Sequence, residues 1–377
     1  MVRIVLTGGG TGGHIYPLIA VAEKLQAMAP GNVELTYLGP KSQFLTEFEE
    51  RDIAVRTIAA SKFRRYGILK NLIDVPRFLV SIIQALAKLY LLMPDAVFSK
   101  GGPGALAVVL AARSYFIPVV IHESDAVPGL TNRISSHLAQ RIGIAFHGAA
   151  RFFPPRKTAF VGNPVREELL RGTMPQGAEK DKLRFDPQEP VLLVLGGSQG
   201  AVPLNTFVTD NLLMLLGKFQ VCHQTGEKNF EEVRRAAESV LRNASETFRP
   251  RYLAKESFDG HALASALSAA DLVLSRAGAG AIYDIAAFGK ASFLVPLESA
   301  ANDHQRANAY EYAGSGAAAV IEQKNLTAHV FLNMAERLLG NPEDRETMER
   351  AAKLFWKPLA AETIAKELFA VAAKTEQ

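Results

Sequence analysis

Short apolar runs alternate with helical patterns along the first half of the chain. The runs that predict buried strands cover residues 2–6, 33–38, 96–98 and 118–121. Apolar residues at helical spacing lie between them, for example over residues 15–28 and 105–114. This alternation is typical of a parallel sheet that is covered by helices on both faces.

The second half repeats the alternation, with strands predicted at 191–195, 219–223, 272–275, 291–295 and 317–321 and helices that include 230–241 and 282–288. Between the halves, Gly162, Asn163 and Pro164 break regular structure and predict a hinge. We therefore expect an α/β fold of two Rossmann-like, doubly wound domains facing a central cleft. The expected domains are residues 1–164 and 165–357, with a final helix within 358–377 that could pack back on the first domain.

Composition supports two domains and a reducing environment. The chain of 377 residues is too long for one ordinary core, and 48% of it is hydrophobic. A single cysteine, Cys222, excludes a disulfide framework and a thiolate metal cluster. The first residues have the pattern of a buried strand rather than of a signal peptide, so we expect a cytoplasmic protein.

Four glycine-rich turns follow predicted strands, two in each half, at residues 8–14, 100–104, 196–200 and 276–280. Glycine lets the backbone approach a ligand closely and aim free N–H groups at it. Open α/β sheets bind ligands at the carboxyl ends of their strands, where all four turns fall. The turns therefore predict phosphate and sugar sites.

Two other classes of nucleotide-binding protein fit these turns less well. A nicotinamide dehydrogenase needs an acidic residue at the end of its second strand, and here that strand ends at Gly39 and Pro40. A P-loop needs Lys-Ser or Lys-Thr after its glycines, and no glycine turn has them. The sequence also lacks an Asp-x-Asp pair, the usual holder of a metal on a nucleotide sugar, so neither a metal nor another cofactor is expected.

At these turns the chain resembles a known family. The segments that carry the resemblance run in order along nearly the whole chain: residues 8–17, 122–125 with 128–132, 161–166, 196–201, 275–278, and 303–305 with 308–309. They are similar to MurG, the N-acetylglucosaminyltransferase that completes the lipid-linked precursor of peptidoglycan. The chain departs from the family's pattern at Pro103, Asp125, Ala281 and Asp284.

The resemblance implies a GT-B fold and an inverting, metal-independent transfer of GlcNAc from UDP-GlcNAc. The implied acceptor is the 4-hydroxyl of MurNAc in undecaprenyl-diphosphoryl-MurNAc-pentapeptide. The expected partners are UDP-GlcNAc on the second domain, the polyprenyl-linked acceptor on the first, and an anionic membrane surface, with no nucleic acid. The alternatives are a transferase for another lipid acceptor, a UDP-GlcNAc 2-epimerase, and a nucleotide-sugar-binding protein without catalysis.

The turns and the resemblance together predict the residues of the site. Contacts with UDP-GlcNAc are expected from Thr11, Gly12, Gly13, Asp125, Arg166, Ser198, Gln199, Phe258, Ala279, Asp284, His304 and Gln305. The acceptor diphosphate is expected at Gly9, Gly10, Gly101 and Gly102.

An inverting transfer needs one base that takes the proton of the acceptor hydroxyl. His14 and Asp125 are the candidates, and either could instead contact the donor sugar. For His14 the alternative is a helix cap. Glu123 could be a structural carboxylate that holds the turn in which Asp125 lies.

Basic and apolar residues alternate just ahead of a long apolar helical stretch. Arg77, Ser81, Gln84 and Lys88 form one polar stripe along this stretch, and the uncharged run 78–87 is too short to span a bilayer. We therefore expect a peripheral protein on the cytoplasmic face of the membrane. The residues expected to touch the headgroup layer are Phe63, Arg64, Arg65, Tyr66, Ile68, Leu69 and Lys70.

Overall fold

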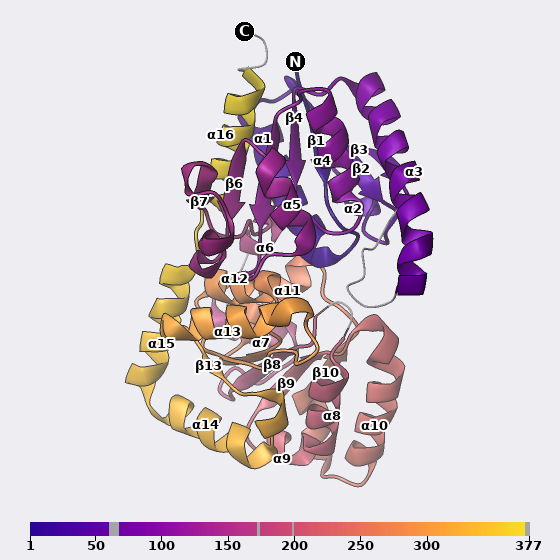
Figure 1. Cartoon of the computed structure of the whole chain (residues 1–377). Helices are drawn as coiled ribbons and strands as arrows, with labels where there is room; N and C mark the ends of the chain where they lie inside the picture. Colours follow the sequence, from indigo (N-terminus) through magenta and orange to yellow (C-terminus); the bar gives the residue numbers. More distant parts are fainter. Residues whose placement is uncertain (60–67, 172–173, 198–199, 374–377) are drawn as a thin grey trace. The chain divides into compact units, whose positions relative to one another are not determined.

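The computed structural model describes residues 1–59, 68–171, 174–197 and 200–373 (Figure 1). The chain folds into two compact units. The N-terminal unit comprises Met1–Arg166 and Lys357–Gln377, and the C-terminal unit comprises Glu167–Trp356. The last helix thus belongs to the same unit as the first strand.

Within its described residues, the N-terminal unit contains a seven-stranded parallel sheet with the order β3-β2-β1-β4-β5-β6-β7. Successive side chains of a strand point to opposite faces, and β1 shows this directly: Ile4 and Leu6 belong to one core cluster and Val5 to another. Both faces of the sheet are therefore buried. The strands are β1 (Val2–Thr7), β2 (Val33–Pro40), β3 (Ala54–Ile58), β4 (Ala96–Ser99), β5 (Val119–Glu123), β6 (Arg141–Ile144) and β7 (Thr158–Phe160).

Helices cover both faces of this sheet. α1 (Gly12–Met28) and α16 (Ala360–Ala373) pack together on one face, where Figure 1 shows α16 in yellow beside α1. α3 (Ile68–Leu92) and α4 (Ala105–Ser114) cover the other face, with α5 (Leu130–Leu138) packed against α4. A short helix, α2 (Thr46–Glu49), joins β2 to β3.

The described part of the C-terminal unit has a six-stranded parallel sheet with the order β10-β9-β8-β11-β12-β13. Its strands are β8 (Val191–Leu195), β9 (Gln220–Gln224), β10 (Tyr252–Lys255), β11 (Leu272–Ser275), β12 (Ser292–Leu294) and β13 (Ala319–Val320). Its helices are α6 (Glu167–Leu170), α7 (Gln176–Lys182), α8 (Val202–Asp210), α9 (Leu212–Leu216), α10 (Phe230–Arg242), α11 (Gly260–Ala269), α12 (Ala279–Phe288), α13 (His304–Gly314), α14 (Ala328–Gly340) and α15 (Pro342–Phe355).

The two parallel sheets with helices on both faces confirm the predicted fold class. Sequence patterning missed β3, β6, β7 and β10, because these strands lack a continuous apolar run. β3, β7 and β10 lie at sheet edges and carry exposed or half-buried residues, whereas β6 is a short strand with an arginine and a glycine. Edge strands are buried on fewer sides, so polar residues are tolerated there.

Candidate active site

The first two glycine turns touch each other at the carboxyl edge of the N-terminal sheet. The backbone N–H of Gly9 donates to the carbonyl of Gly101 at 2.8 Å. A Cβ on Gly102, whose φ is +82°, would lie 2.9 Å from the Cα of Gly9. Glycine is therefore required at this contact, both for the backbone conformation and for the close approach of the two turns.

His14 is the third residue of α1 and not its cap, so the capping alternative is wrong. Its Nδ1 is joined to the Thr11 hydroxyl by a 2.8 Å hydrogen bond, and its Nε2 lies next to Gly102. Burial lowers the pKa of His14 to about 4, helped by the positive charge of Lys100 and opposed by Asp125. The imidazole is therefore neutral at physiological pH.

Asp125 follows β5 in a turn that Glu123 holds in place. One carboxylate oxygen of Glu123 accepts from the backbone N–H of Asp125 at 3.0 Å, and the other accepts from the Asn132 side chain at 3.0 Å. Glu123 thus has the structural role that the sequence left open. Burial and the neighbouring Asp125 raise the pKa of Glu123 to about 7, while Asp125 itself is half-buried.

Sequence reasoning missed two buried residues of this edge, Lys100 and His122. The Lys100 ammonium donates to Nδ1 of His122 at 2.5 Å, and Nε2 of His122 donates to the carbonyl of Gly162 at 2.8 Å. Both side chains are almost fully buried. The sequence signal that could have identified Lys100 is its position directly after the apolar strand β4. A lysine at the end of a buried strand is expected to have partners, because lysine is rarely buried without them.

Arg166 ends the N-terminal unit and lies against an aromatic pair. Its guanidinium carbon is 3.8 Å from the centre of the Tyr16 ring, and Tyr16 packs edge-on against Phe44 at 5.6 Å. A guanidinium stacked on a ring has fewer conformations to lose on binding a ligand. Tyr16 also lies directly behind the first glycine turn, because a Cβ on Gly12 would meet its ring at 3.0 Å.

In the C-terminal unit, the third glycine turn follows β8. Ser198 and Gln199 lie outside the described residues, but the glycines on either side are described. Gly200 has a φ of +76°, and a Cβ there would lie 2.5 Å from the carbonyl oxygen of Thr225. This glycine is thus required by the turn itself, which leads into α8.

The fourth glycine turn leads into α12 with an open helix N-terminus. Gly278 is the N-cap residue and contributes no side-chain hydrogen bond, and Ala279 is the first helical residue. A Cβ on Gly278 or on Gly280 would meet no other atom within 4 Å. The glycines thus leave room beside the first turn, and a helix N-terminus with its N–H groups suits an anion. Asp284 is the sixth residue of α12 and is half-buried.

The residues before α13 adopt an unusual backbone. Asn302 and Asp303 have φ angles of +56° and +55°, so two consecutive non-glycine residues are left-handed just before His304. Such strain is concentrated at functional sites. The Gln305 side-chain oxygen accepts from the Leu297 backbone N–H at 3.1 Å, so this oxygen is used within the protein.

α13 is also tied to the fourth glycine turn, because the Asn308 side chain donates to the carbonyl of Ala277 at 3.2 Å. Ala279, Asp284, His304 and Gln305 thus belong to neighbouring helices of one unit. Phe258 lies just before α11 and is buried in the structure.

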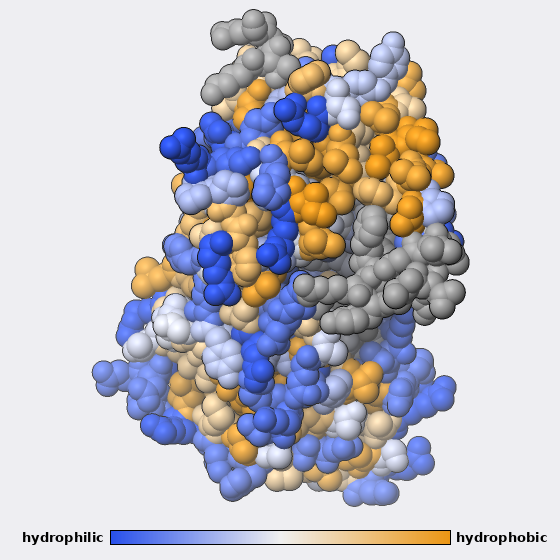
Figure 2. All heavy atoms as spheres, viewed as in Figure 1, coloured by the Kyte–Doolittle hydropathy of each residue, from blue (hydrophilic) through white to orange (hydrophobic). Residues whose placement is uncertain are grey.

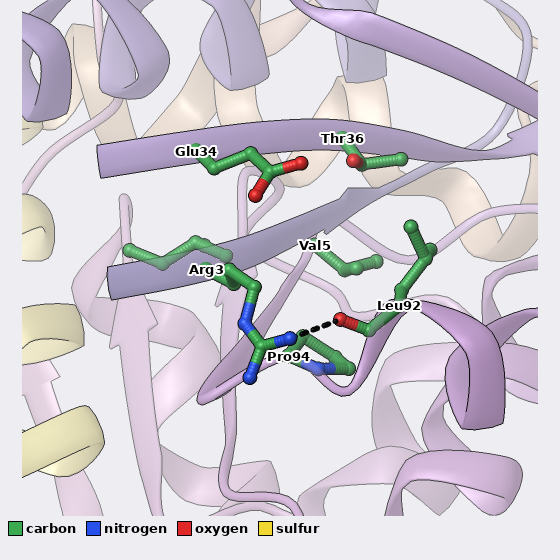
Figure 3. A pocket seen from close by; sticks show the side chains of 7 residues that line it. Arg3, Val5, Glu34, Thr36, Leu92 and Pro94 are labelled. Atoms are coloured by element: carbon green, nitrogen blue, oxygen red, sulfur yellow. Dashed lines mark hydrogen bonds between the residues drawn. The ribbon is translucent and has the colours of Figure 1, made fainter. Parts of the chain in front are cut away.

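A small pocket lies at the opposite edge of the N-terminal sheet (Figure 3). It lies at the amino ends of β1 and β2, where Arg3 donates to the carbonyl of Leu92 at 3.2 Å. The glycine turns follow the carboxyl ends of the strands, so this pocket is separate from the candidate site. Its lining is Arg3, Ile4, Val5, Glu34, Thr36, Leu92 and Pro94.

The predicted membrane contacts Phe63, Arg64, Arg65 and Tyr66 lie outside the described residues. Ile68, Leu69 and Lys70 form the first turn of α3, and their side chains are not described. The stretch Asp74–Leu92 of this helix is long and apolar enough to cross a membrane by length and composition. Orange, apolar atoms gather over α3 in Figure 2. The exposed apolar residues here are Val75, Leu79, Val80, Ile83, Tyr90 and Leu91.

Comparison with known proteins identifies the family of both halves of the chain. Residues 4–144 match the N-terminal domain of glycosyltransferase family 28, and residues 191–364 match its C-terminal domain. A UDP-GlcNAc 2-epimerase structure from Neisseria meningitidis covers 98% of the chain and is itself fully covered, with a TM-score of 0.67. At 15% identity that likeness shows the fold alone.

Two comparisons show the family as well as the fold. A UDP-N-acetylglucosamine–N-acetylmuramyl-(pentapeptide) pyrophosphoryl-undecaprenol N-acetylglucosamine transferase of Halalkalibacterium halodurans is 34% identical over 364 residues, which are 96% of this chain and 97% of the relative. The crystal structure of MurG from Acinetobacter baumannii has a TM-score of 0.73 at 28% identity, over 98% of this chain and 100% of that one. The chain therefore belongs to the MurG family of N-acetylglucosaminyltransferases, within glycosyltransferase family 28.

Proposed function

We propose that this protein transfers GlcNAc from UDP-GlcNAc to the 4-hydroxyl of MurNAc in undecaprenyl-diphosphoryl-MurNAc-pentapeptide, with inversion. The family supports the donor and a lipid-linked acceptor. The observation that carries the chemistry is that the Asp125 charge acts on a neutral His14 where two glycine turns meet. A carboxylate and a neutral imidazole at one edge suit proton removal from a sugar hydroxyl.

In this proposal Asp125 is the base. It takes the proton of the acceptor hydroxyl as that oxygen attacks C1 of GlcNAc, and the bond between C1 and the UDP oxygen breaks. A single displacement of this kind inverts the configuration at C1. His14 is neutral, and its Nδ1 already shares a hydrogen bond with the Thr11 hydroxyl, so it serves as a hydrogen-bonding contact.

The glycine turns stabilise the two diphosphates. Gly9, Gly10, Gly101 and Gly102 bind the acceptor diphosphate, while the open N-terminus of α12 and the turn containing Ser198 bind that of UDP. Negative charge grows on UDP as it leaves, and helix N-termini stabilise such charge without a metal. Asp284 accepts the ribose hydroxyls, and Arg166, Phe258, His304 and Gln305 complete the donor site.

The lipid-linked acceptor requires contact with a membrane, and α3 is suited to it. Its exposed apolar stripe continues into Met93, Tyr115 and Phe116, which are also exposed. One side of α3 packs against the core through Ala85 and Leu89, so the helix lies on the unit rather than being free on all sides. A large exposed apolar patch marks an interaction surface. We therefore propose a peripheral enzyme on the cytoplasmic face of the membrane, with the basic segment ahead of α3 at the headgroups.

The proposal is tested by incubating the protein with labelled UDP-GlcNAc and a short-chain lipid-linked MurNAc-pentapeptide. We expect a labelled lipid-linked disaccharide. Asp125→Asn should abolish product formation and retain UDP binding. Asp52→Asn is the matched control, because Asp52 is exposed and its left-handed backbone also suits asparagine. Recovery of the label as the 2-epimer of UDP-GlcNAc, without disaccharide, would refute the proposal.

A further inference from the structure

Lys100 lies at the centre of the N-terminal sheet's carboxyl edge and is 2% exposed. Its backbone N–H donates to the carbonyl of Thr7 at the end of β1. Its ammonium donates to Nδ1 of His122 at 2.5 Å, to the Ser124 hydroxyl at 2.5 Å and to the Asn163 amide oxygen at 3.5 Å. A lysine ammonium has three protons. All three have partners within the protein, so Lys100 does not contact a substrate.

These partners join three separate segments of the chain. His122 and Ser124 belong to the end of β5 and the turn after it, and Asn163 follows β7. Ser124 also donates to the amide oxygen of Asn163 at 3.1 Å, which closes the network. Lys100 directly follows β4. It therefore holds the segment that carries Asp125 at two points: at Ser124, the residue before Asp125, and at Asn163 of the hinge segment.

The protonation state of His122 follows from its two contacts. Nδ1 accepts from the Lys100 ammonium, so the ring proton is on Nε2, which donates to the Gly162 carbonyl. Burial, and then the charge of Lys100, lower the pKa of His122 well below its usual value. His122 is thus a neutral linker, and the ammonium of Lys100 is the positive charge of this network.

Two acidic side chains act on the charge of Lys100. Burial lowers the pKa of Lys100 to about 7, and Glu123 and Asp125 act in the opposite direction. Glu123 and Asp125 also repel each other, which contributes to the raised pKa of Glu123. Two like charges that share a buried site favour protonation of one of them unless a cation is close. His14 is the other titratable group that responds to Lys100 and Asp125.

We propose that Lys100 is a positioning residue for sugar transfer: it holds the segment Ser124–Asp125 in place through Ser124 and through Asn163. The reaction depends on where the Asp125 side chain lies, so it depends on Lys100 although Lys100 does not touch the reacting atoms. This inference rests on the proposed function, because it presumes that Asp125 is the base.

The first test is Lys100→Met, which keeps most of the length of the side chain and removes the charge and the hydrogen-bond donors. We expect kcat to fall by ~100-fold, the usual contribution of a positioned base. The KM for UDP-GlcNAc should change little, since the donor contacts lie elsewhere. A fall in kcat at an unchanged KM for UDP-GlcNAc separates a misplaced base from a damaged donor site. Lys157→Met is the matched control: Lys157 also donates inside this unit, to the Ala139 carbonyl at 2.8 Å, but outside the network.

The double variant Lys100→Met/Glu123→Gln separates this role from simple destabilisation. It has neither the buried cation nor the buried acid beside Asp125, so no unpaired charge remains to prevent folding. With Glu123→Gln as its reference, loss of Lys100 should still lower kcat, because Ser124 and Asn163 lose the same hydrogen-bond donor. UDP binding should be retained in this folded double variant.

Two results would overturn the role of Lys100. One is a folded Lys100→Met variant with the parent's kcat. The other is a variant whose kcat and UDP affinity fall together, which would mean that Lys100 supports the fold rather than the position of Asp125. Failure of the proposed function would look different, because the parent enzyme itself would then form no disaccharide. In that case the proposed role of Lys100 would also be wrong.

Discussion

The amide oxygen of Gln84 accepts a 2.8 Å hydrogen bond from the backbone N–H of Ala59, just after β3. One turn further along α3, the Lys88 ammonium donates to the carbonyl of Thr57 at 2.5 Å, and Ser81 on the same side is fully buried. Ser81, Gln84 and Lys88 of the polar stripe thus contact the protein, while Arg77 and an apolar stripe are exposed. A surface helix of a soluble domain normally has the opposite arrangement.

The exposed stripe should bind membranes through its apolar side chains. Leu79→Glu combined with Ile83→Glu should weaken binding to anionic vesicles by roughly 2–4 kcal/mol, because two partly embedded side chains lose their apolar transfer energy. The loss should persist at high salt, and UDP binding should not change. Vesicle sedimentation measures the double variant. The control is Met214→Glu, at an exposed apolar position on α9. Parent-like sedimentation of the double variant would exclude this stripe as the contact.

The basic segment ahead of α3 should contribute a salt-sensitive part of the same binding. Replacing Arg64, Arg65 and Lys70 with Glu should remove several kcal/mol, since each basic residue at such a surface contributes roughly 1 kcal/mol. Because this attraction is screened over ~8 Å at physiological ionic strength, the triple variant should differ most from the parent at low salt. If it sediments like the parent at every salt concentration, α3 alone makes the contact.

Transfer should proceed without a divalent metal. The sequence has no Asp-x-Asp pair, and the open N-terminus of α12 offers free N–H groups to the leaving diphosphate. We expect full activity in excess chelator, measured as disaccharide formation. Activity that disappears in chelator and returns with Mg²⁺ or Mn²⁺ would show that the helix N-termini are not sufficient.

Asp284→Ala should weaken binding of UDP-GlcNAc more than it slows the chemical step. A hydrogen-bonded carboxylate contributes on the order of 1.5–3 kcal/mol, or about 10- to 150-fold in Kd. Calorimetric titration with UDP measures this loss. Asp210→Ala, at the exposed end of α8, should leave the affinity unchanged. An Asp284 variant with the parent's affinity would remove this residue from the site.

The C-terminal unit should lose stability in acid because of His223. This ring is buried between the Tyr252 hydroxyl and the Asn205 amide oxygen, each at 3.0 Å, and burial lowers its pKa to about 3. Below a pH of about 6.5 the unfolded chain binds a proton that the folded ring does not bind. The stabilisation present above that pH is therefore lost as the pH falls towards 3, at ~1.4 kcal/mol per pH unit.

Denaturant unfolding between pH 7 and 4 tests this, with the single tryptophan, Trp356, as a probe in the same unit. His223→Gln should reduce the slope of unfolding free energy against pH. His329→Gln, at an exposed position of α14, should not. Equal slopes in the parent and the His223 variant would mean that other groups cause the acid sensitivity.

Much of the fold followed from local pattern. Continuous apolar runs predicted the central strands, because strands buried on both faces exclude polar residues. The glycines at 9, 102 and 200 were recognised as turn positions, and the structure gives the reason: two of them have left-handed backbone, and a Cβ on any of the three would collide with a neighbour. The edge strands β3 and β10 escaped prediction because half-exposed strands carry mixed residues.

The sequence by itself determined the parallel α/β architecture, the positions of the glycine turns and the family. Each of these depends on neighbours in the chain or on matching residues in order along it. Only the tertiary structure decided that Lys100 contacts His122 and Asn163, that the polar side of α3 contacts the protein, and that the Gln305 oxygen is already used. The Lys100 contacts join residues that are distant in sequence, and they arise because the order of the strands brings the ends of β4, β5 and β7 to one edge.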